Sequence, residues 1–297
     1  MGVRLIRSRF ASRSQYQRQN QFPTFGKRWS SARHKCRLLY QAFKQKRLGV
    51  KEIKALIKCY LPVKVKVWGE YACFTRPEFG VERVSYDVMT PSAARGILQA
   101  IFWKPEMAWR VRKIHVLAPI RHISLRRNET KSVQSERTAR RWAEKRQGHY
   151  YANRDVAQRQ SLFLRDVAYL ITADIALQPY AQAHIAKYRD QFRRRVARGQ
   201  SFTTPYLGTR ECSAFFGPPA GTESSIEKST DLGLMLFDVL YTDDPEGPLE
   251  YRRHSGSVTK VVRGRAEAAF FHARLERGVL SVPDLYAPFE PAVEKRA

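Results

Sequence analysis

The sequence contains little cysteine and no long apolar run, and each shortage excludes a class of protein. Four cysteines are spread over 297 residues without a Cys-x-x-Cys or cysteine–histidine ligand spacing. A structural zinc site and a disulfide framework are therefore not expected, which fits the reducing cytosol. No apolar run approaches the ~20 residues that a membrane-spanning helix needs. We therefore expect a cytoplasmic protein that uses no metal or other cofactor and has no membrane partner.

Acidic residues are also scarce, because 27 Asp and Glu stand against 54 Lys and Arg. The formal net charge is +27 and the isoelectric point is about 10.3. A positive charge of this size is neutralised by counter-ions or by a polyanion, and nucleic acid is the usual polyanion. A soluble basic protein without such a partner and a membrane-surface binder remain as alternatives. The hydrophobic content of 43% predicts that most of the chain folds around a core.

The first sixty residues form a distinct basic extension, with sixteen Lys and Arg and a single acid, Glu52. Residues 1–30 are rich in Gln, Ser and Arg and are expected to be disordered, whereas the rest could form short basic helices. Three interpretations stay open: an RNA-binding arm that orders on contact, an Arg-rich transit peptide, or a start assigned too far upstream, with translation beginning near Leu61.

The stretch from Pro62 to Pro105 is the most informative part of the sequence. Residues 63–68 alternate valine with Lys or Trp, which predicts a strand with one apolar face and one basic, aromatic face. Thr90 followed by Pro91 is a helix-start signal and predicts a helix through Phe102. A strand whose exposed face carries Lys and Trp suits single-stranded nucleic acid.

The elements after this helix continue an α+β pattern. The polar residues 128–160 predict a long loop with helical pieces. The other expected elements are a hairpin of strands 109–116 and 120–127 turning at Ala118-Pro119, a strand 162–177, a helix from Pro179 to Arg198, and a strand ending at Phe216. Strand, helix, strand, strand, helix, strand is the order of a ferredoxin-like (RRM-like) fold.

The last part of the sequence predicts a small antiparallel β-sheet. Residues 217–231 are a turn-rich connector, and short strand patterns recur from Leu232 onward. We therefore expect an α+β protein in three parts: the basic extension 1–60, a ferredoxin-like domain 61–217, and a small antiparallel β-sheet domain with its tail, 218–297.

Several long segments resemble one family in the same order: VWGEYACFTRPEF, ERVSYDVMTPSAARGILQAIFWKP, PIRHISLRRNE, LRDVAYLI, PYLGTREC and DLGLMLFDVLY. From about residue 61 to 290 the chain is similar to the CRISPR-associated RAMP subunit of type I-C systems. The resemblance implies a metal-independent endoribonuclease that cuts precursor CRISPR RNA in the repeat. It also implies that the protein stays on the 5′ handle of the mature CRISPR RNA, within a surveillance complex formed with other subunits.

Metal-free RNA cleavage needs a group that deprotonates the 2′-hydroxyl, a group that protonates the leaving 5′-oxygen, and a cation facing the phosphorane. The second predicted helix offers Lys187 as the cation and His184 or Tyr188 for the proton transfers. For His184 a surface role stays open. Tyr188 shares the apolar stripe of this helix, so for it a core role stays open.

The resemblance also implies catalytic positions, and two of them differ here. The family has a tyrosine near the end of the first helix and a lysine with a neighbouring histidine on the second. In this sequence the lysine is Lys187, the neighbour is Tyr188, and the tyrosine position holds Phe102, which cannot exchange a proton. A non-catalytic RNA-binding scaffold subunit of the same complex is therefore the alternative function.

Eight further residues are expected to bind RNA. Trp68 offers a stacking surface, Gly208 lets the backbone approach a phosphate or base closely, and Arg210 suits a bidentate contact. An ordinary β-turn is the alternative at Gly208, and a solvated surface lysine is the alternative for Lys187. The arginines expected to contact phosphates are Arg76, Arg126, Arg127, Arg194 and Arg195.

Overall fold

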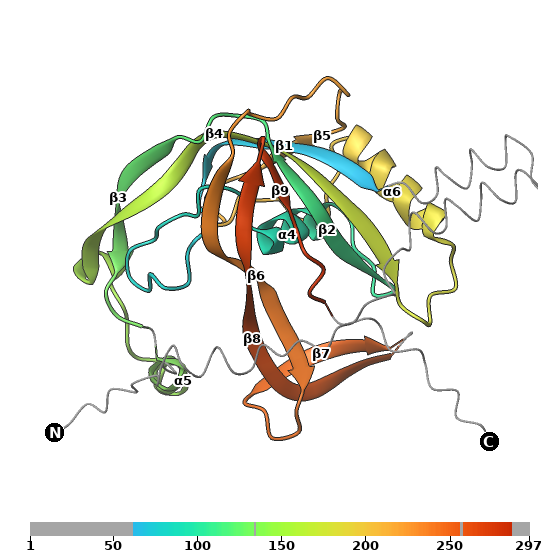
Figure 1. Ribbon diagram of the computed structural model, residues 1–297. Coiled ribbons are helices and arrows are strands. Elements are labelled where there is room, and N and C mark those ends of the chain that lie inside the picture. Colours follow the sequence, from blue (N-terminus) through green and yellow to red (C-terminus); the bar gives the residue numbers. More distant parts are fainter. Residues whose placement is uncertain (1–61, 134, 256–257, 287–297) are drawn as a thin grey trace, which may run out of the picture. The chain divides into compact units, whose positions relative to one another are not determined.

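The structure is a computed structural model that describes residues 62–133, 135–255 and 258–286. The compact unit that begins at Pro62 is an α+β fold dominated by one nine-stranded sheet, in which every strand pair is antiparallel (Figure 1). The predictions for the basic extension, residues 1–60, lie outside the described residues. Within the described ranges, no helix is both long enough and apolar enough to cross a membrane.

The first strand and helix form as the sequence predicts. Strand β1 (Val63–Ala72) buries its three valines and leaves Trp68 exposed on the opposite face. Helix α4 (Pro91–Ile101) begins after Thr90, whose hydroxyl accepts a hydrogen bond from the Ala93 N–H at 3.3 Å. This bond satisfies one of the amide groups that a helix start leaves unpaired, and the proline at the first helical position needs no such partner.

The predicted hairpin is wrong in its pairing, although both strands form. Strands β2 (Met107–Val116) and β3 (His122–Thr130) do not pair with each other. Instead they pair with successive lengths of the same edge of β4 (Val156–Leu177). The Leu117 N–H donates to the Ala168 carbonyl, so the connection runs along β4 rather than turning back. A 22-residue strand offers enough edge for both partners.

Helix α6 (Ile185–Ala197) begins later than its predicted start at Pro179. The loop before the helix bonds to the chain after α4 instead. The Gln178 N–H donates to the Glu106 carbonyl, and the Tyr180 hydroxyl donates to the Pro105 carbonyl at 2.9 Å. Once the helix begins, Tyr188, Phe192 and Val196 are buried, as their helical spacing predicts.

The C-terminal strands do not form a separate sheet. Strand β8 (Val258–Glu276) pairs with both β6 (Thr230–Asp243) and β7 (Leu249–Ser255), and short β9 (Val279–Ser281) pairs with both β8 and β2. The strand order β5-β1-β4-β2-β9-β8-β6 is therefore continuous, with β3 and β7 attached to β4 and β8. The remaining elements are α5 (Glu136–Lys145), a 3-10 turn (Ala152–Arg154) and β5 (Phe215–Gly217).

Candidate functional site

The turn after α4 meets the loop before α6 and the tip of β7. We call residues 102–106 the Phe102 turn. The Tyr188 hydroxyl donates to the Glu106 carboxylate at 2.5 Å, which joins the first turn of α6 to the Phe102 turn. The Tyr180 hydroxyl, which donates to the Pro105 carbonyl, also lies 3.3 Å from the carbonyl oxygen of His254 on β7. These contacts bring three segments that are distant in sequence into one place: the Phe102 turn, the start of α6 with its preceding loop, and the tip of β7.

The three predicted catalytic side chains differ in exposure. Lys187 is exposed on the first turn of α6 and has no ion-pair or hydrogen-bond partner for its amine among the described residues. His184 is also exposed, and its Nδ1 atom accepts the Ala186 N–H at 3.3 Å as the N-cap of α6. Tyr188 is buried. Burial and the neighbouring Glu106 carboxylate raise the pKa of the Tyr188 hydroxyl to about 12. Their catalytic roles stay predictions.

Phe102 is completely buried, and an arginine of α6 covers it. The Arg195 guanidinium lies 5.3 Å from the Phe102 ring centroid, and its Nη1 atom donates to the Ile101 carbonyl at 2.7 Å. A cation at the C-terminal end of α4 also complements the helix dipole. Arg195 thus has a structural role in joining the two helices, whereas Arg194 beside it is exposed.

Trp68 lies on the exposed face of β1, as predicted, and it has an aromatic neighbour that the sequence did not reveal. Register places Phe215 of β5 opposite Trp68, with ring centroids 6.2 Å apart and planes inclined by 24°. The Lys66 amine lies 5.9 Å from the Trp68 ring. Trp68 lines an open groove of about 630 Å³. Trp68 and Phe215 remain 39% and 61% exposed, so they form one accessible aromatic surface.

Gly208 is required by packing. We call residues 206–213 the Gly208 turn. The glycine has φ of +89°, and a Cβ atom there would lie 2.0 Å from the Cys73 carbonyl oxygen at the end of β1. The Cys73 N–H donates to the Leu207 carbonyl at 3.0 Å, which fixes this close approach of two backbones. A structural reason for glycine is therefore present without RNA.

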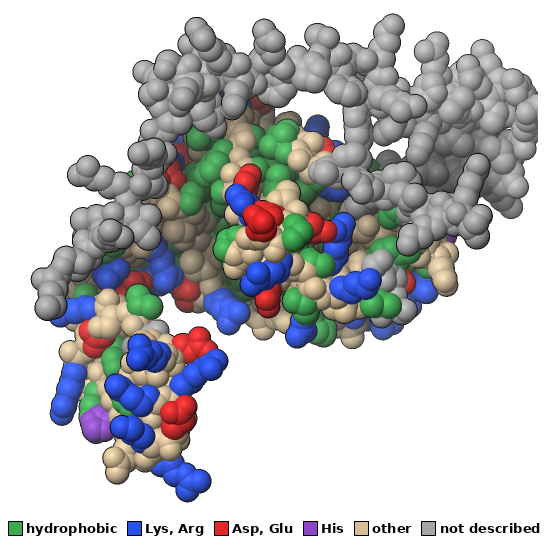
Figure 2. All heavy atoms as spheres, turned by 90° about the horizontal axis from the view of Figure 1, so that it is seen from below, with side chains coloured by type: hydrophobic (Ala, Val, Ile, Leu, Met, Phe, Trp, Pro, Cys, Tyr) green, Lys and Arg blue, Asp and Glu red, His purple; other side chains and the backbone are tan. Residues whose placement is uncertain are grey.

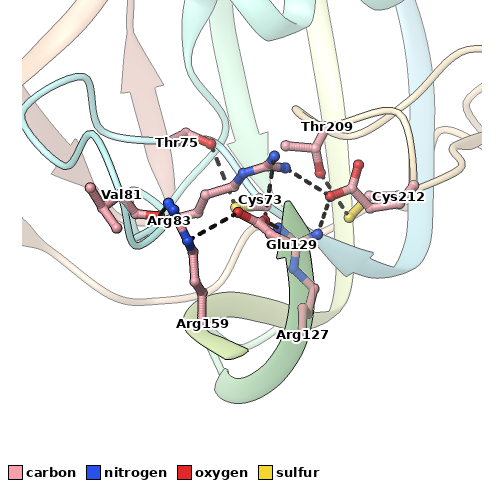
Figure 3. Close-up of polar contacts among 10 residues, drawn as sticks. Cys73, Thr75, Val81, Arg83, Arg127, Glu129, Arg159, Thr209 and Cys212 are labelled. Carbon is pink, nitrogen blue, oxygen red and sulfur yellow. Dashed lines mark hydrogen bonds and ion pairs between the residues drawn. The ribbon is translucent and has the colours of Figure 1, made fainter. Parts of the chain in front are cut away.

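Five charged side chains hold the Gly208 turn against the β3–β4 ribbon (Figure 3). Arg127 donates to Glu211 at 2.5 Å and to Glu129 at 2.7 Å. Arg83 donates to Glu211 at 3.0 Å, and Arg159 lies 3.9 Å from Glu129. We call these residues the arginine–glutamate network. Burial pulls the pKa of Glu211 upward, but its own backbone N–H and the Arg127 guanidinium outweigh burial and lower that pKa.

The predicted RNA-binding arginines therefore fall into two groups. Some already have partners: Arg127 in the network, Arg195 on α4, and Arg76, which lies 4.8 Å from the Tyr86 ring centroid and 3.9 Å from Glu78. Others are exposed and have no side-chain partner within the described ranges: Arg126, Arg194 and Arg210. Figure 2 shows many further Lys and Arg side chains interspersed with acids over the visible surface.

Three features of this net-basic α+β fold define a candidate RNA-binding protein. They are an exposed aromatic surface, an exposed lysine at a helix start, and exposed arginines without side-chain partners within the described ranges. A family model described as CRISPR-associated protein (Cas_Cas5) matches residues 63–283. The chain therefore belongs to this CRISPR-associated family, which confirms the resemblance in its sequence.

Two curated relatives align with about three quarters of this chain. The chain is 48% identical to a Thermus thermophilus protein named CRISPR pre-crRNA endoribonuclease Cas5d, over 74% of this chain and 91% of the relative. It is 40% identical to a Mannheimia succiniciproducens protein of the same name, over 76% of this chain and 96% of the relative. A solved crystal structure of a CRISPR-associated protein is 22% identical, with a TM-score of 0.49, over 75% of this chain and 91% of that one.

Proposed function

We propose that the protein cuts precursor CRISPR RNA within the repeat, without a metal ion, and then stays bound to the 5′ handle. The observation that carries this proposal is the identity of 48% and 40% to two proteins named pre-crRNA endoribonucleases, over nearly their whole length. The net charge of +27 supports an RNA substrate, because phosphate contacts supply most of the affinity of such proteins.

The topology supports a ferredoxin-like domain at residues 61–217. The strand order β5-β1-β4-β2, with α4 after β1 and α6 after β4, is that of a β-α-β-β-α-β unit, with β3 inserted as an additional partner of β4. Domains of this kind bind single-stranded RNA on their sheet face, where Trp68 and Phe215 lie. Residues 218–297 would form the smaller β-rich domain.

The roles assigned to individual residues follow from their exposure. The 2′-hydroxyl attacks the scissile phosphorus, which yields a 2′,3′-cyclic phosphate and a free 5′-hydroxyl. The exposed Lys187 amine stabilises the phosphorane, and His184 at the start of α6 exchanges a proton. The exposed arginines Arg126, Arg194 and Arg210 contact phosphates, and Trp68 stacks on a base.

One observation favours a second candidate function. Phe102 is completely buried and the Tyr188 hydroxyl is bonded to Glu106, so two of the three expected catalytic positions present no group to RNA. A non-catalytic subunit that binds the handle would have the same exposed aromatic and basic surfaces. In either case the partners would be CRISPR RNA and the other subunits of a type I-C surveillance complex in the cytoplasm.

The two candidates are separated by incubating the purified protein with end-labelled repeat RNA in EDTA. An endoribonuclease yields a product that ends in a 2′,3′-cyclic phosphate, and the protein then remains bound to the 5′ handle in a gel-shift assay. Binding without any cut product would overturn the first function and leave the scaffold.

A further inference from the structure

A histidine of the C-terminal strands lies beside the turn in which the family's tyrosine is missing. His254, at the tip of β7, is half-buried, and its ring centroid lies 5.5 Å from that of Trp103. Trp103 directly follows Phe102 in the sequence and is 40% exposed. The segment that lost a titratable side chain thus gains a different one from a strand that comes much later in the chain.

The contacts around His254 fix the orientation of its ring. Its Nδ1 atom lies 3.0 Å from the hydroxyl oxygen of Thr259, the residue paired with it across the β7–β8 ladder. The Tyr180 hydroxyl approaches the His254 backbone carbonyl, which places this strand tip against the loop before α6. The Nε2 atom has no hydrogen-bond partner within the described ranges. One ring nitrogen is therefore positioned by the protein, and the other is open to a ligand.

We propose that His254 is the general acid of RNA cleavage. This inference rests on the proposed endoribonuclease function. As the 2′-oxygen bonds to phosphorus, the bond from phosphorus to the 5′-oxygen breaks, and the His254 imidazolium gives its Nε2 proton to that oxygen. His184 accepts the 2′-hydroxyl proton and passes it to water, and the neutral His254 imidazole regains a proton from water. The step therefore needs no co-reactant besides water.

The surroundings of His254 suit a scissile nucleotide. The exposed face of Trp103 can stack on the base beside the cut, which places the adjacent phosphate near the imidazole. The charged groups on the surrounding elements are Arg252 on the same face of β7, and Lys104 and Glu106 in the Phe102 turn. Glu106 is occupied by the Tyr188 hydroxyl, so the two cations remain to face the RNA backbone.

The test compares two RNA substrates in single-turnover cleavage with EDTA. One is the natural repeat. The other carries a sulfur in place of the 5′-oxygen at the mapped cut, and a thiolate leaves without needing a proton. His254→Gln keeps a hydrogen-bonding side chain beside Thr259 but cannot act as an acid. The matched control is His272→Gln, an exposed histidine near the other end of β8 that lies 3.4 Å from Asp231.

We expect His254→Gln to slow cleavage of the natural repeat by at least ~100-fold and to cut the sulfur substrate at the wild-type rate. The control should match the wild type, and both variants should bind the repeat equally well.

An equal loss of rate on both substrates, or an unchanged rate on the natural repeat, would overturn the role of His254 while leaving the endoribonuclease intact. A wild-type protein that cuts neither RNA overturns the proposed function, and this inference with it.

Discussion

The Phe102 turn and the Gly208 turn both lie in segments that resemble the family, yet the structure uses them differently. In the Gly208 turn, only glycine fits, because the Cys73 backbone lies against it. Glu211 in the same turn is held by Arg83 and Arg127. In the Phe102 turn the first side chain is buried, but Trp103 after it is exposed beside His254. The Gly208 turn is closed by packing, whereas the Phe102 turn remains open to a ligand.

A segment can therefore resemble the family without presenting its side chains to a ligand. The segment PYLGTREC resembles the family, but backbone packing accounts for its glycine and ion pairs within the protein account for its glutamate. The segment IFWKP holds Phe102 where the resemblance implies a tyrosine, but neighbouring elements bring titratable and basic groups to the same place. Four substitutions test this contrast.

Lys187→Ala should have the largest effect on the open region. An exposed amine at the start of α6 has no structural partner within the described ranges, so its loss should leave the fold intact. Removing one group that stabilises transition-state charge costs ~100- to 1,000-fold in rate. We expect that loss in cleavage of the repeat, with binding changed less than twofold. Lys131→Ala, another exposed lysine, is the control, and an unchanged rate in Lys187→Ala would contradict its assignment.

Gly208→Ala should have the largest effect on the closed region. The new Cβ would overlap the Cys73 carbonyl in a left-handed backbone conformation, and we expect a loss of more than ~2 kcal/mol of stability. Thermal unfolding measures this loss. Gly221→Ala has a similar positive φ but open space, and Gly80→Ala has open space without positive φ. If Gly208→Ala were no worse than Gly221→Ala, the packing explanation would be wrong.

Tyr188→Phe tests whether the first turn of α6 uses its tyrosine for chemistry or for packing. The hydroxyl donates to the Glu106 carboxylate, and a hydrogen bond to a charged group contributes about 1.5–3 kcal/mol. We expect a loss of stability of that size, with the cleavage rate within about twofold of wild type because the ring stays buried. Tyr206→Phe, at an exposed tyrosine, is the control. A large fall in rate without a fall in stability would make Tyr188 the catalyst.

Features that depend on residues close together in the sequence were predicted correctly. Strand pairing and the contacts of the site depend on residues far apart in the sequence, so the sequence did not reveal them. The valine alternation of β1 and the Thr90-Pro91 helix start were correct because period and capping act within a few residues. The partner of β3 was wrong because a hairpin and two strands on one long edge have the same local pattern. No spacing in the sequence connects His254 to Phe102, because β7 reaches that turn only through the whole sheet.

Glu211→Gln should have the smallest effect, and it tests the network that closes the Gly208 turn. The Glu211 carboxylate is partly exposed, so we expect a loss of stability of at most ~1 kcal/mol at neutral pH. Because the folded pKa of Glu211 is lowered, its contribution is present above its unfolded pKa and fades as pH falls through the folded pKa. Wild type and variant should therefore converge in unfolding free energy at acid pH, whereas Glu144→Gln on α5 should match wild type throughout. Removing this carboxylate also leaves Arg83 and Arg127 sharing Glu129 as their carboxylate partner within the described ranges, so binding to the repeat should tighten and its salt dependence should steepen. Unchanged binding would mean that RNA does not reach the Gly208 turn.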